Sequence, residues 1–113
     1  MYEAEIQGLY QSVKTEMLEY LEEAEPDYTR ADVDACLKIM DDYRTKIGAA
    51  PDREVGMLVV KEAVLALNAL AERAEELIET SQREDLAEII ILGAAARGFN
   101  DRNDDITEEW REW

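Results

Sequence analysis

Apolar residues recur along this chain at the three- and four-residue steps of amphipathic helices. The pattern predicts helices over residues 3–24, 30–47, 52–78 and 82–97, followed by a short C-terminal helix over 107–112. No stretch carries a strand signal, and the links between the periodic segments are short. The predicted fold is therefore all-α: one domain, 1–113, forming a four-helix bundle with a short C-terminal helical tail.

The ends of the predicted helices carry residues that commonly start or stop a helix. Pro26 ends the first helix because its ring disfavours helical geometry at the preceding residue. Residues 29–32 resemble a capping box for the second helix, and Gly48 is expected to end that helix in the left-handed conformation. Residues 81–84 have the pattern of a capping box for the fourth helix, and Gly98 is expected to end it.

The most apolar stretch of the chain is residues 57–71. Lys61 and Asn68 lie seven residues apart, in register with Glu54 and Glu75, so these four residues share one narrow stripe of the helix. The rest of the circumference is apolar, which predicts that this helix lies in the middle of the bundle. Its charged residues come too early in the run for a membrane span, which needs about 18 or more apolar residues.

The chain carries 28 acidic and 12 basic residues, a net charge of −16. Such a charge repels nucleic acid and anionic membranes, so we expect neither as a partner. It serves solubility, or it marks contact with a basic protein partner. Glu22 and Glu23 oppose the dipole at the end of the first helix, which makes that end a place to look for a cationic partner. The first residues are acidic rather than a basic signal segment, so we expect a cytoplasmic location.

Histidine is absent from the sequence, and cysteine occurs once. The absence of histidine excludes Ser-His-Asp and Cys-His triads, the usual zinc sites and Glu-x-x-His di-iron sites. Cys36 lies on the apolar stripe of the second predicted helix, where we expect a buried, inert thiol. These features favour a non-enzymatic protein without a cofactor, which acts through self-association or by binding another protein.

Two acidic pairs provide an alternative, because carboxylates at i and i+3 on facing helices can form an oxygen cage for Mg²⁺. The run from Glu84 to Glu88, followed by three isoleucines, resembles the second acidic helix of the MazG-type all-α nucleotide pyrophosphatases. In that family Glu-x-x-Glu and Glu-x-x-Asp helices hold magnesium for hydrolysis of nucleoside triphosphates. The resemblance, over residues 58–98, implies the same activity here, with the acids of the second pair exchanged. The implied ligands are Glu72, Glu75, Asp85 and Glu88.

A second acidic pattern lies near the C-terminus, at the spacing of EF-hand ligands. Its members are Asp101, Asn103, Asp105, Glu109 and Glu112. Ile106 stands where the sharp turn of an EF-hand needs glycine, so we expect a solvated acidic loop rather than a calcium site.

Four residues are candidates for an interface between copies of the chain. Trp110 and Trp113 share one face of the predicted C-terminal helix, and a tail of this kind is ordered only if its indoles are buried. They are expected to dock on their own bundle or on a neighbouring chain. Gly93 and Ala94 begin a small-residue surface that lets another helix approach closely. We therefore expect a homo-oligomer, in the simplest case a dimer.

Three segments resemble a group of short, acidic, helical bacterial proteins that also occur as products of mobile gene cassettes. The segments are Leu65 to Ala71, Leu77 to Leu86 and Asp105 to Trp113, and the Trp-Arg-Glu-Trp ending is the most distinctive. The resemblance implies a helical fold and a bacterial source, and it carries over no catalytic residues. A third hypothesis is an acidic inhibitor or immunity protein that mimics nucleic acid or neutralises a basic toxin.

Overall fold

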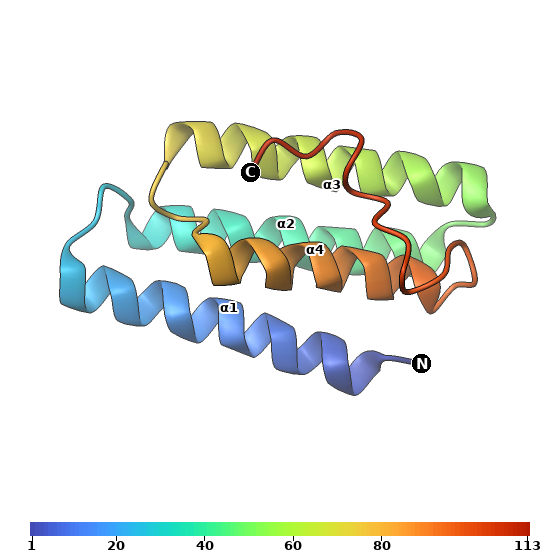
Figure 1. Ribbon diagram of the computed structural model, residues 1–113, viewed down its shortest axis with the longest axis horizontal. Coiled ribbons are helices and arrows are strands. Elements are labelled where there is room, and N and C mark those ends of the chain that lie inside the picture. The colour runs from blue at the N-terminus through green and yellow to red at the C-terminus, as the bar shows by residue number, and fades with distance from the viewer.

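The computed structural model describes all 113 residues and contains four helices and no strand (Figure 1). They are α1 (Glu3–Ala24), α2 (Arg30–Ala49), α3 (Arg53–Arg73) and α4 (Thr80–Ala95). The helices run along the long axis of a molecule that measures 42 × 26 × 22 Å (Figure 1). The prediction of an all-α, four-helix fold is confirmed. No helix combines the length and the hydropathy that crossing a bilayer would require.

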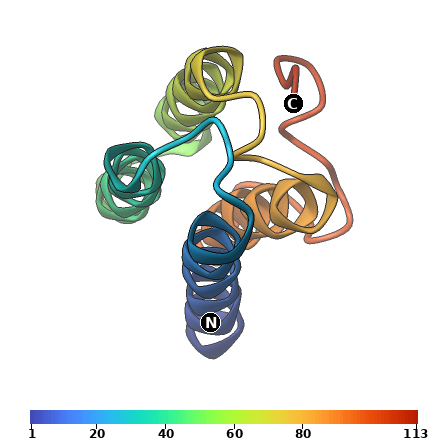
Figure 2. The same cartoon turned by 90° about the vertical axis from the view of Figure 1, so that its left-hand side faces the viewer.

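The bundle is built from two helix pairs. α1 packs chiefly on α4, and α2 packs chiefly on α3, while α1 and α3 make no contact (Figure 2). The two pairs enclose one continuous hydrophobic core of 24 buried residues. Cys36 lies in this core, and burial raises the pKa of its thiol to about 12, so it stays protonated at neutral pH.

The helix at the centre of the bundle is α4 rather than the predicted 57–71 helix. Eight of the 16 residues of α4 are buried, against six of the 21 residues of α3. On α3, Leu58 and Leu65 keep 62% and 46% of their surface exposed. The prediction of a central third helix is therefore wrong, because α3 has one principal helical neighbour and its apolar circumference is wider than that neighbour covers.

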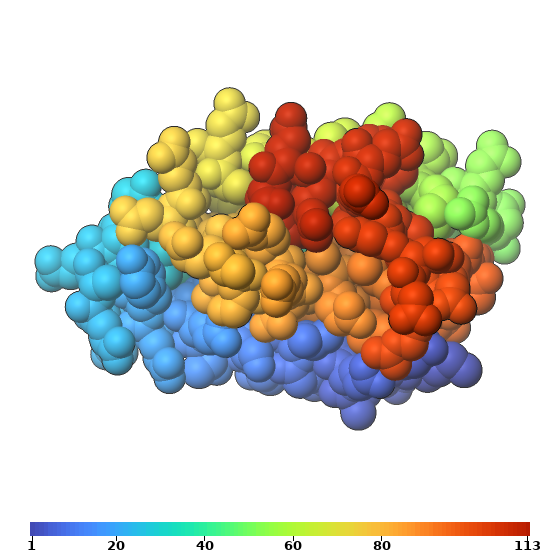
Figure 3. All heavy atoms as spheres, in the orientation of Figure 1, coloured from blue at the N-terminus to red at the C-terminus, as the bar shows by residue number.

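The C-terminal segment docks on its own chain as a series of turns, without the helix predicted over 107–112. It lies across α3 and α4 on the face of the molecule shown in Figure 3. Asn68 holds it at two points: Nδ2 donates to the carbonyl of Trp110 at 2.8 Å, and Oδ1 accepts from the N–H of Glu112 at 3.0 Å. These bonds occupy backbone groups of the segment, and a single i to i−4 bond, from Arg111 to Thr107, remains.

The predicted helix starts and stops agree with the structure at several points. α1 ends at Ala24, two residues before Pro26, and Asp32 accepts the backbone N–H of Thr29 at 3.0 Å, as a capping box requires. Gly98, just past α4, has a left-handed φ of 77°. α2 continues past Gly48 to Ala49, however. Its last carbonyls accept from Arg97, whose Nη1 lies 2.8 and 2.7 Å from the oxygens of Ile47 and Gly48.

The largest difference in helix boundaries lies between α3 and α4. α3 ends at Arg73 instead of residue 78, and the segment 74–79 forms turns that bury Ala74 and Leu77. Extending α3 would have placed Glu75, Glu76 and Glu79 in its last turns, against the helix dipole. α4 then begins at Thr80, so Ser81 lies in its first turn and caps nothing.

Candidate binding site at the acidic end

A cavity of about 340 Å³ opens at the end of the bundle where the α1–α2 and α3–α4 connections meet. This end is on the left in Figure 1 and faces the viewer in Figure 2. We call the cavity the acidic pocket. Its lining comes from α1, from both connections and from the start of α4: Glu16, Glu19, Tyr20, Glu23, Tyr28, Glu76, Leu77, Glu79, Ser81 and Gln82.

Five of the ten lining residues are glutamates, and none of the ten is basic. None of the five carboxylates forms an ion pair within the chain. Glu16 is held in place, because its Oε2 accepts from Ser81 Oγ at 3.1 Å and from Gln82 Nε2 at 3.0 Å. The pocket therefore concentrates negative charge that the protein itself does not neutralise.

Two tyrosines form the aromatic part of the lining. The rings of Tyr20 and Tyr28 are stacked, with centroids 6.4 Å apart and planes 21° apart. Tyr28 is buried and donates to the carbonyl of Met17 at 2.7 Å, and burial raises the pKa of its phenol to about 12. The charge of Glu76 raises the pKa of the exposed Tyr20 phenol. Both phenols stay neutral at physiological pH, and the exposed Tyr20 offers a neutral π face beside the carboxylates, with the buried Tyr28 stacked on it.

Gln82 supplies a buried polar group to the lining. Its side chain is 8% exposed, and while Nε2 donates to Glu16, Oε1 has no hydrogen-bond partner in the protein. Nearby, burial and then the charges of Glu16 and Glu84 raise the pKa of Asp85. A cation bound nearby would favour the ionised form of Asp85.

The four residues of the predicted magnesium site do not come together. Glu72 and Glu75 line a separate hollow beside Asn68 and the C-terminal segment, and Asp85 faces Glu16 of α1. Glu88 forms an ion pair with Arg102. No group of three or more Asp, Glu, Cys or His side chains in the structure has a geometry that could hold a metal ion.

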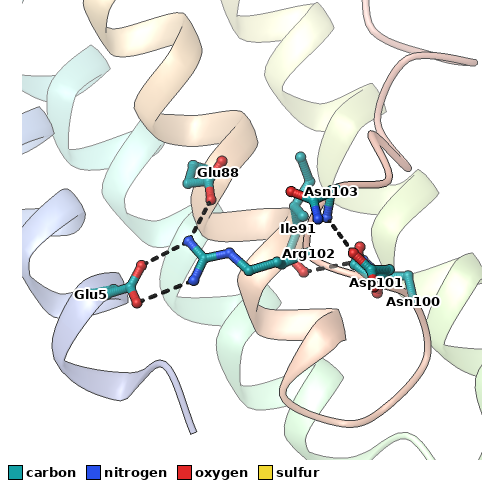
Figure 4. Close-up of polar contacts among 7 residues, drawn as sticks. All are labelled: Glu5, Glu88, Ile91, Asn100, Asp101, Arg102 and Asn103. Atoms are coloured by element: carbon teal, nitrogen blue, oxygen red, sulfur yellow. Dashed lines mark hydrogen bonds and ion pairs between the residues drawn. The ribbon is translucent and has the colours of Figure 1, made fainter.

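Figure 4 shows the surroundings of Glu88. The guanidinium of Arg102 lies between the carboxylates of Glu5 and Glu88, with nitrogen–oxygen distances of 3.1 and 3.7 Å. This contact ties the loop after α4 to α1 and α4. The candidate EF-hand ligands of the loop bond to their own backbone: Asp101 accepts from the N–H of Asn103 at 2.9 Å, and Asp105 accepts from the N–H of Thr107 at 3.0 Å. Asp101 and Asp105 thus serve as turn-forming residues of the acidic loop.

The four predicted interface residues all pack within the chain. Trp110 and Trp113 are half-buried against their own core, with Lys61 Nζ over the ring of Trp110 at 6.0 Å. Ala94 is fully buried. Gly93 faces Tyr43 of α2, and a Cβ added to Gly93 would lie 3.0 Å from that ring. The close approach that the small residues permit is therefore made by α2, whose Tyr43 hydroxyl donates to the carbonyl of Ile90 at 2.6 Å.

The sequence indicates the glutamate-rich end of α1 as a place for a cationic partner, but not the other half of the pocket. Its periodicity places Glu76 and Glu79 near the end of a longer third helix, and it does not distinguish Tyr20 and Tyr28 from the other tyrosines. The excess of acids at the predicted helix end was the available signal that the helix stops early. Comparisons with known protein families, with curated proteins and with solved structures give no match to this chain.

Proposed function

We propose that this protein is a non-enzymatic binding protein that self-associates and whose acidic pocket takes a basic segment of a protein partner. One observation carries the proposal of a basic partner. Five glutamates and two tyrosines from separate segments line one cavity, and the protein supplies no lysine or arginine there. Elsewhere seven acids form ion pairs with the chain's own basic residues.

A lysine or arginine side chain suits each component of the pocket. An arginine can donate paired N–H groups to the carboxylates and stack its planar guanidinium on Tyr20. The tyrosine faces attract a cation within about 6 Å of the ring centroid. A pocket of about 340 Å³ is at the small end of the range for ligand sites, so it fits side chains better than a folded surface.

Exposed ion pairs contribute about 0–1 kcal/mol each, so useful affinity needs several of them at once. The five glutamates can provide such a set. We therefore expect binding that strengthens with the number of basic residues in the segment and weakens as salt rises.

Calorimetric titration with a hexa-arginine peptide tests the proposal. The variant Glu19→Gln/Glu23→Gln/Glu79→Gln should bind the peptide about tenfold more weakly, a loss of roughly 1.4 kcal/mol. The matched control Glu3→Gln/Glu108→Gln/Glu109→Gln removes the same charge from exposed positions outside the pocket. It should bind within about threefold of the wild type, a difference of under roughly 0.7 kcal/mol. An equal loss of affinity in both variants would show that binding depends only on net charge, and it would refute the acidic pocket as the binding site.

A further inference from the structure

α3 exposes a continuous row of residues that no other part of the chain covers. The row repeats at steps of three and four residues, and we call it the α3 seam: Val55, Leu58, Glu62, Leu65, Ala69 and Glu72. All six residues are exposed, and Val55, Leu58 and Leu65 are the only large apolar residues besides Met1 and Tyr20 to be so. Alternating steps of three and four are the spacing at which one helix packs along another.

The charge at the middle of the α3 seam is already neutralised. Glu62 forms an ion pair with Lys46 of α2, so the position between Leu58 and Leu65 carries no net charge. The C-terminal segment occupies the neighbouring stripe of α3, where Lys61 and Asn68 contact it. It therefore borders the α3 seam without covering it.

The α3 seam lies on a large part of the molecule that is electrically balanced. Residues 30–73, which hold α2 and α3, contain eight acidic and seven basic residues, a net charge of −1. The rest of the chain carries 20 acidic and five basic residues, a net charge of −15. Two copies of such a chain repel each other less where both present this balanced side than where they present the acidic segments.

We propose that the α3 seam is a homodimer interface, on which α3 of a second copy packs through the same residues. The inference rests on the self-association in the proposed function and names its surface. A two-fold contact requires one patch that is compatible with itself, and an apolar row on a neutral surface meets that condition. A basic partner would instead favour the acidic end, where the charge lies.

Analytical ultracentrifugation at low and high salt tests this interface. The wild type should sediment as a dimer, and more tightly at high salt, because salt screens the repulsion between two copies of charge −16. Leu58→Gln/Leu65→Gln and Leu58→Asp/Leu65→Asp should each weaken the dimer at least about tenfold, the latter more strongly. The control Gln11→Glu/Ser12→Asp adds the same two charges on exposed positions of α1 and should leave dimerisation within about threefold.

The outcomes separate the interface from the rest of the proposed function. A wild type that stays monomeric at high salt refutes both the interface and self-association. If the Leu58→Gln/Leu65→Gln variant still dimerises as tightly as the wild type, the α3 seam is refuted and the dimer contact lies elsewhere. A loss of helical circular dichroism in that variant would contradict the exposure of the two leucines and refute the seam as well. Hexa-arginine titration of the same variant reports the acidic pocket independently and should match the wild type.

Discussion

α3 and α4 are both rich in apolar residues, but the bundle buries those of α4 more completely than those of α3. On α4, Ile89, Ile90 and Leu92 are fully buried, whereas Leu58 and Leu65 of α3 remain exposed. α4 contacts α1, α2 and α3, and the C-terminal segment lies against it (Figures 1 and 3). α3 packs mainly on α2. Burial of the two helices therefore follows the number of elements that cover each of them.

Charge also distinguishes two regions of the molecule, the α2–α3 half and the acidic end of the bundle. Four of the seven ion pairs join residues of the α2–α3 half, where acids and bases alternate. At the acidic end, by contrast, the glutamates of the pocket have no basic partner. One side is neutral and apolar, which favours contact with a copy of itself, and the other is suited to a cation.

The largest effect is expected when a leucine is replaced by alanine on α4, and the same replacement on α3 provides the comparison. Leu92→Ala removes a fully buried side chain and should lower the free energy of unfolding by about 2–5 kcal/mol. Leu58→Ala removes a side chain that is mostly exposed and should change it by less than about 0.5 kcal/mol. Urea denaturation at a low protein concentration, where dimers dissociate, measures both values. Equal losses would mean that the two helices are covered alike.

The sequence was sufficient for the fold class because each helix has its own periodic apolar pattern. The spacing of Val33, Cys36 and Met40 predicts a buried stripe, and these three residues are fully buried. The position of each helix in the bundle could not be predicted in this way, because it depends on contacts between segments that are distant in the sequence. The polar stripe with Lys61 and Asn68 is one example. Its Lys61 and Asn68 contact residues 110–112 of the docked C-terminal segment, while Glu54 and Glu75 remain exposed.

For a similar reason, only the α1 side of the acidic pocket could be predicted from the sequence. Glutamates at the end of α1 are visible in the sequence as unfavourable charges near a helix C-terminus. Glu76 and Glu79 reach the same cavity because α3 stops at Arg73, which lets the next segment turn toward α1. That turn depends on burying Leu77 against the core, a long-range contact that periodicity does not reveal.

An intermediate effect is expected where the C-terminal segment meets α3. Asn68→Ala removes both side-chain bonds to that segment, which at about 0.5–1.5 kcal/mol each should cost roughly 1–3 kcal/mol of unfolding free energy. The chain has two tryptophans, both in this segment, so intrinsic fluorescence reports its release directly. We expect a red-shifted emission and easier quenching by acrylamide. The control Asn103→Ala, in the exposed loop, should leave the spectrum unchanged. An unchanged spectrum in Asn68→Ala would refute the role of Asn68 in holding the C-terminal segment.

The smallest expected effect concerns Asp85, on the acidic side of the comparison. Burial, and then the charges of Glu16 and Glu84, raise the pKa of this carboxyl in the folded state. Below the ordinary range of carboxyl pKa values both states are protonated, so ionisation of Asp85 has no effect on stability there. As the pH rises, the unfolded chain ionises first and the folded state loses stability through the folded pKa.

Asp85→Asn removes this loss, so the variant should match the wild type near pH 3 and become the more stable of the two toward pH 7. Thermal melts across that range measure the difference. Because Glu16 is the larger of the two charged causes, the gain should shrink in a Glu16→Gln background but persist in part, since burial remains. A gain of equal size at every pH would show that the substitution acts through packing and that like charges are not crowded at this end.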